Sequence, residues 1–237
     1  LLVVDNTISS ELAGGLRQME MDMVGDGWQV VRLDSPRHGA GTPASLKSAI
    51  IAARAATPAI NSTLLFGKLP MVRSGMLAPD GHTPARAHET DTYYADLNGN
   101  WTDSTVNVVA AGADETENIP GDGKYDQSNY PSALELATGR GTFHDMTTFR
   151  KWENEYLRDY LNKDHAWRQG LRVVPYRGYF ADANTTGYYL FTARNWLTPM
   201  FGSLNVTRST TLQPAMNTDP YIWAVSNDAL APTDQVR

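Results

Sequence analysis

Short apolar runs alternate with longer periodic segments over the first 67 residues of the chain. Residues 1–5, 28–33 and 61–67 each form an apolar run of the length expected for a buried strand. The two segments between them carry apolar residues at helical spacing. This strand–helix–strand–helix–strand order predicts the α/β class, with a mainly parallel sheet flanked by helices and right-handed crossovers.

Both intervening segments carry signals of helix ends. The first helix is expected to run from a cap at Ser9 or Ser10 to about Val24. The second is expected to begin at Pro43, with Thr42 as its cap. The first helix also has a stripe of core-facing residues at spacings of three and four, namely Leu12, Leu16, Met19 and Met23.

Periodicity is lost over about residues 68–130, which are rich in Gly, Pro, Asp and Asn. A structureless loop of this length is unusual in a compact domain, so we expect short irregular strands or an ordered insertion. Regularity then returns as a strand, a helix and two further strands, at residues 134–139, 147–162, 171–176 and 221–225. Residues 1–237 are interpreted as a single α/β domain that carries this irregular insertion.

Both ends of the chain lie in or beside segments that look structured. Leu1 starts inside a strand-like run without an initiator Met, and the residues before Arg237 form no evident terminal element. We therefore expect the chain to be a fragment of a longer protein.

Composition narrows the possible chemistry. The sequence has no cysteine, which excludes disulfides, thiolate zinc sites and a cysteine nucleophile within this chain. A net charge of −6 and scattered Lys and Arg residues argue against nucleic acid as a partner. No apolar run approaches the roughly 18 residues of a membrane-spanning helix, so no membrane span is expected.

Candidate metal chemistry is concentrated around Gly99 and in a second acidic glycine loop at 121–126. The candidate calcium ligands are Asp96, Asn98, Asn100, Asp103, Asp122 and Asp126. The same residue types are also the usual turn formers, because their side chains accept backbone hydrogen bonds. The first loop begins like a calcium loop but lacks the Glu of its twelfth position, so bound calcium and a plain turn both stay open.

Other catalytic motifs are weak or missing. His38-Gly39 follows the second predicted strand and is interpreted as part of a surface loop rather than as a general base. The five histidines, His82 and His88 among them, form no His-x-x-x-His or His-Glu-x-x-His pattern, which argues against a zinc enzyme. The chain also lacks a Gly-x-Ser-x-Gly elbow and a phosphate-binding loop.

Several short stretches follow one another in an order typical of one family. They are Leu1–Asp5, Trp28–Val30, Leu64–Pro70, Tyr93–Gly99, Leu134–Arg140 and Glu155-Tyr156. Together they resemble the strands and the "Asp-x-x-Tyr … Gly-Arg … Tyr-Glu" progression of the gingipain-type cysteine peptidases, in the caspase-like clan. The segments Ser74–Asp103 and Asn162–Arg168 are similar to poorly described exported bacterial relatives of that family.

This resemblance implies a caspase-like fold, a location outside the bacterial cell or in its envelope, and peptide or protein substrates. In the family, a His-Gly follows one late strand and a Cys follows the next, and the thiolate attacks the peptide carbonyl. Here Tyr221–Val225 resembles the strand before the His-Gly, but Ser226 and not His-Gly follows it. We therefore assign no residue to the catalytic dyad, and interpret Ser226 as structural.

Two hypotheses about function follow from the sequence. The first is a peptidase-like domain of an exported bacterial protein, a candidate cysteine endopeptidase in its full-length form. The alternative is a non-catalytic binding or structural domain that is stabilised by calcium. The two differ in whether a Cys follows the next apolar strand of the full-length protein.

Overall fold

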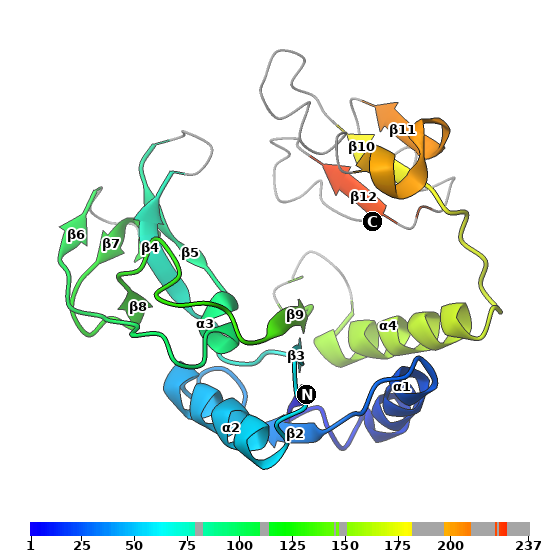
Figure 1. The fold of residues 1–237 in the computed structure, drawn as a ribbon, viewed down its shortest axis with the longest axis horizontal. Coiled ribbons are helices and arrows are strands. Elements are labelled where there is room, and N and C mark those ends of the chain that lie inside the picture. Colours follow the sequence, from blue (N-terminus) through cyan, green and yellow to red (C-terminus); the bar gives the residue numbers. More distant parts are fainter. Residues whose placement is uncertain are drawn as a thin grey trace. The chain divides into compact units, whose positions relative to one another are not determined.

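The computed structural model of the 237-residue chain describes residues 1–78, 83–109, 114–144, 146, 151–181, 197–209, 221 and 223–226. The fold is mixed α/β, with several mostly parallel sheets flanked by helices (Figure 1). The chain divides into two compact units, Leu1–Asn162 and Lys163–Arg237, and each is described by itself. None of the described helices is both long and apolar enough to cross a membrane.

The first unit is built on a four-stranded parallel sheet with the strand order β2-β1-β3-β9. Its strands are β1 (Leu2–Asp5), β2 (Arg32–Ser35), β3 (Ser62–Phe66) and β9 (Ala137–Gly141). The chain winds outward from β1 to β2 and then crosses back to β3 on the other side of β1. The boundary between β1 and β3 is therefore a topological switch point.

Helices cover both faces of this sheet (Figure 1). They are α1 (Ala13–Gly25), α2 (Pro43–Ala56) and α4 (Glu153–Arg168). The helix α2 belongs to the core that contains Val3 and Leu65, whereas α1 and α4 share the core that contains Leu2, Val4 and Phe66. Neighbouring strand residues thus enter opposite cores, as the pleat of a strand requires.

The predicted apolar stripe of α1 is confirmed, but the start of this helix is not. Leu12, Leu16 and Met19 are buried in the core. The helix begins at Ala13 instead of after Ser9 or Ser10, because the residues before it form a series of hydrogen-bonded turns. In α2, by contrast, the cap is as predicted, since the hydroxyl of Thr42 accepts the N–H of Ser45.

Two strands of the sheet lie a few residues beyond their predicted positions. The run at 28–33 predicts a strand that the structure places at 32–35, and the run at 134–139 predicts one that begins at Ala137. The N–H groups of Glu135 and Leu136 both donate to the carbonyl of Ala95 in the insertion. These two residues are therefore already paired elsewhere before β9 begins.

The helix predicted at 147–162 is displaced toward the C-terminus, as α4. The first residues of the predicted range lie outside the described residues. Lys151 and Glu155 have the i,i+4 spacing of a helical ion pair, but Lys151 Nζ lies 2.5 Å from Asp159 Oδ2. Glu155 instead accepts the N–H of Trp152 at 2.7 Å, which satisfies a donor at the helix start.

The insertion predicted at about 68–130 is ordered wherever the structure describes it. Its elements are β4 (Arg73–Leu77), β5 (Arg86–Glu89), α3 (Thr92–Ala95), β6 (Asn107–Val108), a 3₁₀ turn at Asp114–Thr116, β7 (Glu117–Asn118) and β8 (Lys124–Tyr125). One sheet has the order β5-β4-β8, and β6 pairs with β7 as an antiparallel ribbon. Buried residues of α3 join the core beneath α2, which fixes the insertion to the sheet.

The second unit contains a parallel three-stranded sheet in the order β11-β10-β12. Its strands are β10 (Gly178–Ala181), β11 (Val206–Ser209) and β12 (Trp223–Ser226). The strand predicted at 221–225 is confirmed over residues 223–225, which belong to β12. The strand predicted at 171–176 is wrong, because these residues form bends around Pro175, which has no N–H for a strand ladder.

Candidate functional site

Charged side chains gather where the strands of the first sheet end. Asp5 ends β1, Arg37 lies in the loop after β2, and Glu153 begins α4. Open α/β sheets bind ligands beyond the carboxyl ends of their strands, next to a switch point. This carboxyl edge is therefore the candidate functional site of the first unit.

Arg37 joins two carboxylates that come from different elements. Its Nη1 lies 2.6 Å from Asp5 Oδ2, and its Nη2 lies 2.5 Å from Glu153 Oε2. The side chain of Asp5 is fully buried and that of Glu153 is 11% exposed. Burial lowers the pKa of Arg37, but the two carboxylates outweigh this effect and raise it overall. The guanidinium therefore stays charged and ties α4 to the end of β1.

The second oxygen of Asp5 is satisfied within its own loop. Asp5 Oδ1 accepts the N–H of Thr7 at 2.9 Å and its hydroxyl at 2.7 Å. Gly67, the first residue after β3, has φ of +92°, and a Cβ there would lie 2.7 Å from the Cβ of Asp5. A glycine is needed at this place because the turn after β3 passes directly over Asp5.

Thr142 and His144, which follow β9, continue this network. The hydroxyl of Thr142 lies 3.0 Å from His144 Nδ1 and 3.4 Å from Glu153 Oε1. A hydroxyl beside an imidazole is one element of an activated nucleophile. Here, however, the carboxylate contacts the hydroxyl and Arg37, so the contacts describe an ion-pair network that links β1, β2, β9 and α4.

Sequence reasoning finds only part of this edge. Asp5 and residues 34–41 end or follow predicted parallel strands and so belong to this edge, but the sequence gives no role to Glu153, Thr142 or His144. A helix predicted from 147 puts Glu153 in its second turn. Carboxylates are favoured in the first turn of a helix, so Glu153 itself argues that α4 begins later than residue 147.

A second network joins the residues that carry the family resemblance. Tyr94 lies in the stretch Tyr93–Gly99, Arg140 ends the stretch Leu134–Arg140, and Asp91 lies just before the first of these. Nη2 of Arg140 lies 2.7 Å from the carboxylate of Asp91, and its Nη1 donates to the carbonyl of Leu69 at 3.0 Å. Both Arg140 and the hydroxyl of Tyr94 donate to the carbonyl of Pro70, at 3.2 and 2.7 Å.

The network around Arg140 fixes the turn that follows β3. This turn has no regular partner strand, and its carbonyl groups would otherwise be buried without donors. The side chain of Arg140 is 13% exposed and bridges β9 to the insertion. Arg140 of β9 and Tyr94 of the insertion, which are far apart in the sequence, thus hold the same turn after β3.

The first three candidate calcium ligands include two that share one protein partner, because Ser132 Oγ lies 2.6 Å from Asp96 Oδ1 and 2.7 Å from Asn98 Oδ1. Asp96 is fully buried, and its carboxylate accepts hydrogen bonds from Gly99 N–H at 2.7 Å, Ser132 Oγ at 2.6 Å and Trp101 Nε1 at 3.1 Å. Asn98 donates to Glu135 at 2.6 Å, and Asn100 is exposed. A Cβ on Gly99 would lie 2.1 Å from Asp96 Oδ2, so the loop closes tightly on this carboxylate.

The other three candidate ligands hold two loops, 102–105 and 119–124. Asp103 accepts the N–H groups of Gly121 and Gly123, and Asp122 accepts those of Ile119 and Lys124. The donors to Asp126 are the N–H groups of Ser104 and Thr105 and the hydroxyl groups of Thr102 and Ser104. Each carboxylate therefore organises the backbone around it.

Hydrogen bonds set the charge state of these carboxylates. Burial raises the pKa of Asp96, but the hydrogen bonds from Ser132, Gly99 and Trp101, with the nearby Lys47 ammonium, outweigh it and lower the pKa overall. In the same way, hydrogen bonds lower the pKa values of Asp122 and Asp126 against the effect of burial. All three carboxylates are ionised at neutral pH without a metal ion.

This arrangement does not fit a calcium site. Calcium takes six to eight oxygen ligands around one centre, whereas these oxygens face N–H and O–H donors of different loops. Within the part of the chain that the structure describes, no group of three or more His, Cys, Asp or Glu side chains is arranged to hold a metal ion. The geometry favours the turn-forming role of these six residues.

Two histidines singled out by sequence serve local contacts. His38 is exposed, its N–H donates to Lys68 O at 2.7 Å, and its Nδ1 accepts the N–H of Met71 at 3.3 Å. The ring of His88 contacts Leu77 O at 3.2 Å, and His82 lies outside the described residues. The loop of His38 therefore braces the turn after β3.

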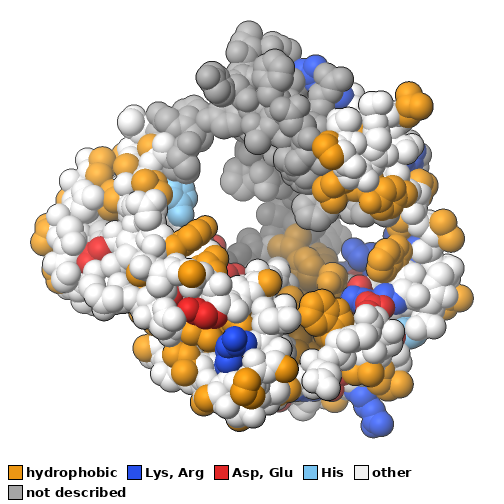
Figure 2. Space-filling view, in the orientation of Figure 1, with side chains coloured by type: hydrophobic (Ala, Val, Ile, Leu, Met, Phe, Trp, Pro, Cys, Tyr) orange, Lys and Arg blue, Asp and Glu red, His pale blue; other side chains and the backbone are white. Residues whose placement is uncertain are grey.

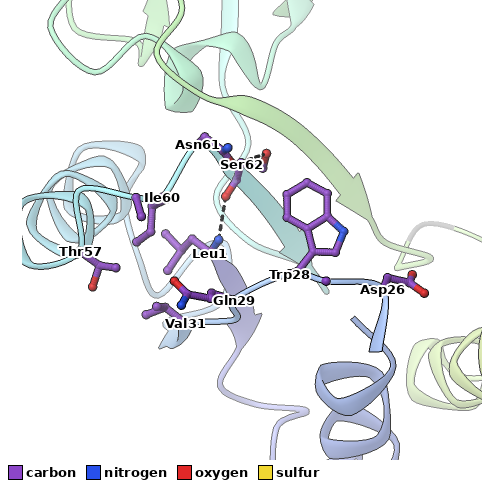
Figure 3. Close-up of a pocket in the computed structure, with 11 residues that line it drawn as sticks. Leu1, Asp26, Trp28, Gln29, Val31, Thr57, Ile60, Asn61 and Ser62 are labelled. Atoms are coloured by element: carbon purple, nitrogen blue, oxygen red, sulfur yellow. Dashed lines mark hydrogen bonds between the residues drawn. The ribbon is translucent and has the colours of Figure 1, made fainter. Parts of the chain in front are cut away.

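A half-open pocket of about 450 Å³ lies at the opposite, amino edge of the sheet (Figure 3). The indole of Trp28 stands on one side of it, and Leu1 and Ile60 lie on the other. The N-terminal ammonium of Leu1 donates to Ser62 O at 2.7 Å. The pocket lining also includes Asp26, Thr57 and Ser62, and we assign no reaction to it.

Comparisons with protein-family models, with curated proteins and with solved structures find no match for this chain. The candidate site therefore rests on its own geometry.

Proposed function

We propose that this chain is the peptidase-like scaffold of a gingipain-type, caspase-like protein exported by a bacterium, whose full-length form is a cysteine endopeptidase. The observation that supports this proposal best is that Tyr94 and Arg140, from two of the stretches that carry the resemblance, both donate to the carbonyl of Pro70 in a third. Motifs that carry the resemblance lie far apart in the sequence, yet they meet in space. A chance similarity of short motifs would not require them to touch.

The proposed chemistry needs a thiolate and a base that this chain does not supply. The sequence has no cysteine, and β12, the strand that resembles the one before the His-Gly, ends at Ser226. In the proposal, the first unit positions the substrate-binding edge, and the nucleophile comes from sequence beyond Arg237. The chain by itself has no peptidase activity by the thiolate mechanism.

Two experiments test this proposal. Hydrolysis of Arg- or Lys-linked reporter peptides by this chain should stay at background. Turnover would contradict the proposal that the catalytic Cys and His lie outside this chain. The coding sequence beyond Arg237 should contain a Cys after the next apolar strand, and replacing that Cys by Ala in the full-length protein should abolish turnover.

The second candidate function is a non-catalytic domain that binds a partner at the carboxyl edge. The closed network of Arg37, Asp5 and Glu153 favours it, because these groups already satisfy one another instead of facing a reacting atom. A downstream sequence without a Cys after the next strand would support this candidate and overturn the peptidase.

A further inference from the structure

Among the described residues, β6 has a partner strand on one side only, which is β7. Asn107 pairs with Asn118, and the N–H of Val109 donates to Thr116 O at 3.1 Å. Hydrogen-bonded and non-hydrogen-bonded pairs alternate along an antiparallel ladder. The N–H and C=O groups of Val108, between these two pairs, therefore point away from β7, toward the outer edge of β6.

Three of the four side chains from 106 to 109 are valines and none is charged, although β6 itself has only two residues. Val106, Val108 and Val109 are 70%, 50% and 47% exposed, and neither Lys nor Pro occurs in the described residues from 103 to 109. β6 is the outermost strand of this part of the fold in Figure 1, and Figure 2 shows hydrophobic side chains at the surface of this region. Strand edges of this kind are templates for pairing with another segment.

The surroundings of the edge are strongly acidic. Residues 103–109 and 114–124 contain five carboxylates and one basic residue, Lys124. Asp114 and Glu115 are 79% and 46% exposed, and they pair with Lys124 at 3.1 Å and with Arg73 at 3.5 Å. With Arg73 included, the carboxylates still outnumber the basic residues around this edge. Two copies of this chain joined through β6 would bring these like charges together, whereas a basic segment would be attracted.

We propose that the outer edge of β6 binds an extended, basic peptide segment of another protein by adding it as a strand. Backbone hydrogen bonds to Val108 would supply the pairing. The apolar residues of the segment would cover Val106 and Val108, and its Lys or Arg side chains would face the surrounding carboxylates. This proposal does not depend on the peptidase assignment.

Binding of a fluorescein-labelled octapeptide of alternating Lys and Val, measured by fluorescence anisotropy, tests the proposal. The probe should bind, and binding should weaken as salt is raised, because the attraction is partly electrostatic. The same peptide with Glu in place of Lys should not bind. The Lys/Val peptide with all its backbone amides N-methylated should not bind either, because it cannot donate to the strand edge.

Val108→Lys should weaken binding of the probe about tenfold, because it places a like charge at the edge. Val106→Lys serves as a second variant on the same edge. Val24→Lys is the matched control, since Val24 is 58% exposed on α1, and it should leave binding unchanged. Equal binding of the Glu/Val or N-methylated peptide, no effect of both edge variants, or a dimer that Val108→Lys disperses would each overturn the proposal.

Discussion

The sheet layers and the insertion of the first unit are stabilised in different ways. Between the sheet and its helices, fully buried aliphatic residues such as Leu16, Ile50 and Leu65 fill two cores. In the insertion, the strands are two to five residues long, and carboxylates such as Asp103 and Asp126 hold the loops. In this acidic, Gly-rich sequence, the hydrogen bonds that the carboxylates accept thus order the loops.

The largest expected effect belongs to the apolar core. Leu65→Ala removes a fully buried side chain from β3, and we expect the free energy of unfolding to fall by about 3 kcal/mol, because a cavity is left. Urea denaturation measures the change. Leu77→Ala, at a leucine that is 42% exposed, should change it by less than about 0.5 kcal/mol. Similar losses for both variants would contradict the account of the core.

The carboxyl edge should come second. Arg37→Gln leaves the buried carboxylate of Asp5 without its ion pair, so we expect a loss of about 2 kcal/mol in the free energy of unfolding. The control is Arg158→Gln, which breaks an ion pair with Glu11 whose side chains are 46% and 48% exposed, and it should cost less than about 1 kcal/mol. Equal losses in the free energy of unfolding for the two variants would mean that the ion pairs of Arg37 contribute no more than an exposed surface pair.

A smaller and local effect is expected in the insertion. Asp126→Asn removes the charge from hydrogen bonds made by Ser104, Thr105 and Thr102, and should cost about 1 to 2 kcal/mol. Limited proteolysis should become faster within the insertion, while the sheet retains its protection. Asp159→Asn, at a carboxylate that is 58% exposed, is the control and should leave the rate unchanged. Equally faster cleavage in the insertion and in the sheet would show that the insertion does not unfold independently of the sheet.

The difference between the sheet and the insertion also explains which parts of the fold could be predicted from the sequence. The strands and helices of the first 67 residues follow from apolar spacing, and the stripe of α1 is buried as expected. The position of β9 could not be read in this way, because Glu135 and Leu136 pair with Ala95, a contact between distant parts of the chain. The role of each carboxylate depends on which donors the fold brings to it, and residue type alone leaves cation binding and turn formation equally open.

The smallest expected effect is that of calcium. Since the carboxylates of Asp96, Asp103, Asp122 and Asp126 already accept hydrogen bonds from the protein, calcium at millimolar concentration should leave the midpoint of thermal unfolding unchanged relative to chelator. A ligand that binds only the native state would raise this midpoint by mass action. A clear rise that Asp96→Asn removes would restore the calcium hypothesis.

The central claim is that ionised carboxylates hold the insertion, whereas apolar burial holds the sheet. The folded pKa values of Asp96, Asp122 and Asp126 are lowered, so their contribution is complete above the unfolded value of about 4 and is lost as the pH falls through the folded values. Native-state hydrogen exchange tests this claim most directly. It gives the free energy of opening at each backbone amide, once the measured rate is corrected for the intrinsic exchange rate at that pH.

Between pH 6 and pH 3, the amides of Gly99, Ser104 and Thr105 should lose protection while those of β1 and β3 keep theirs. Equal loss of protection in the insertion and in the sheet, or none in either, would contradict the account.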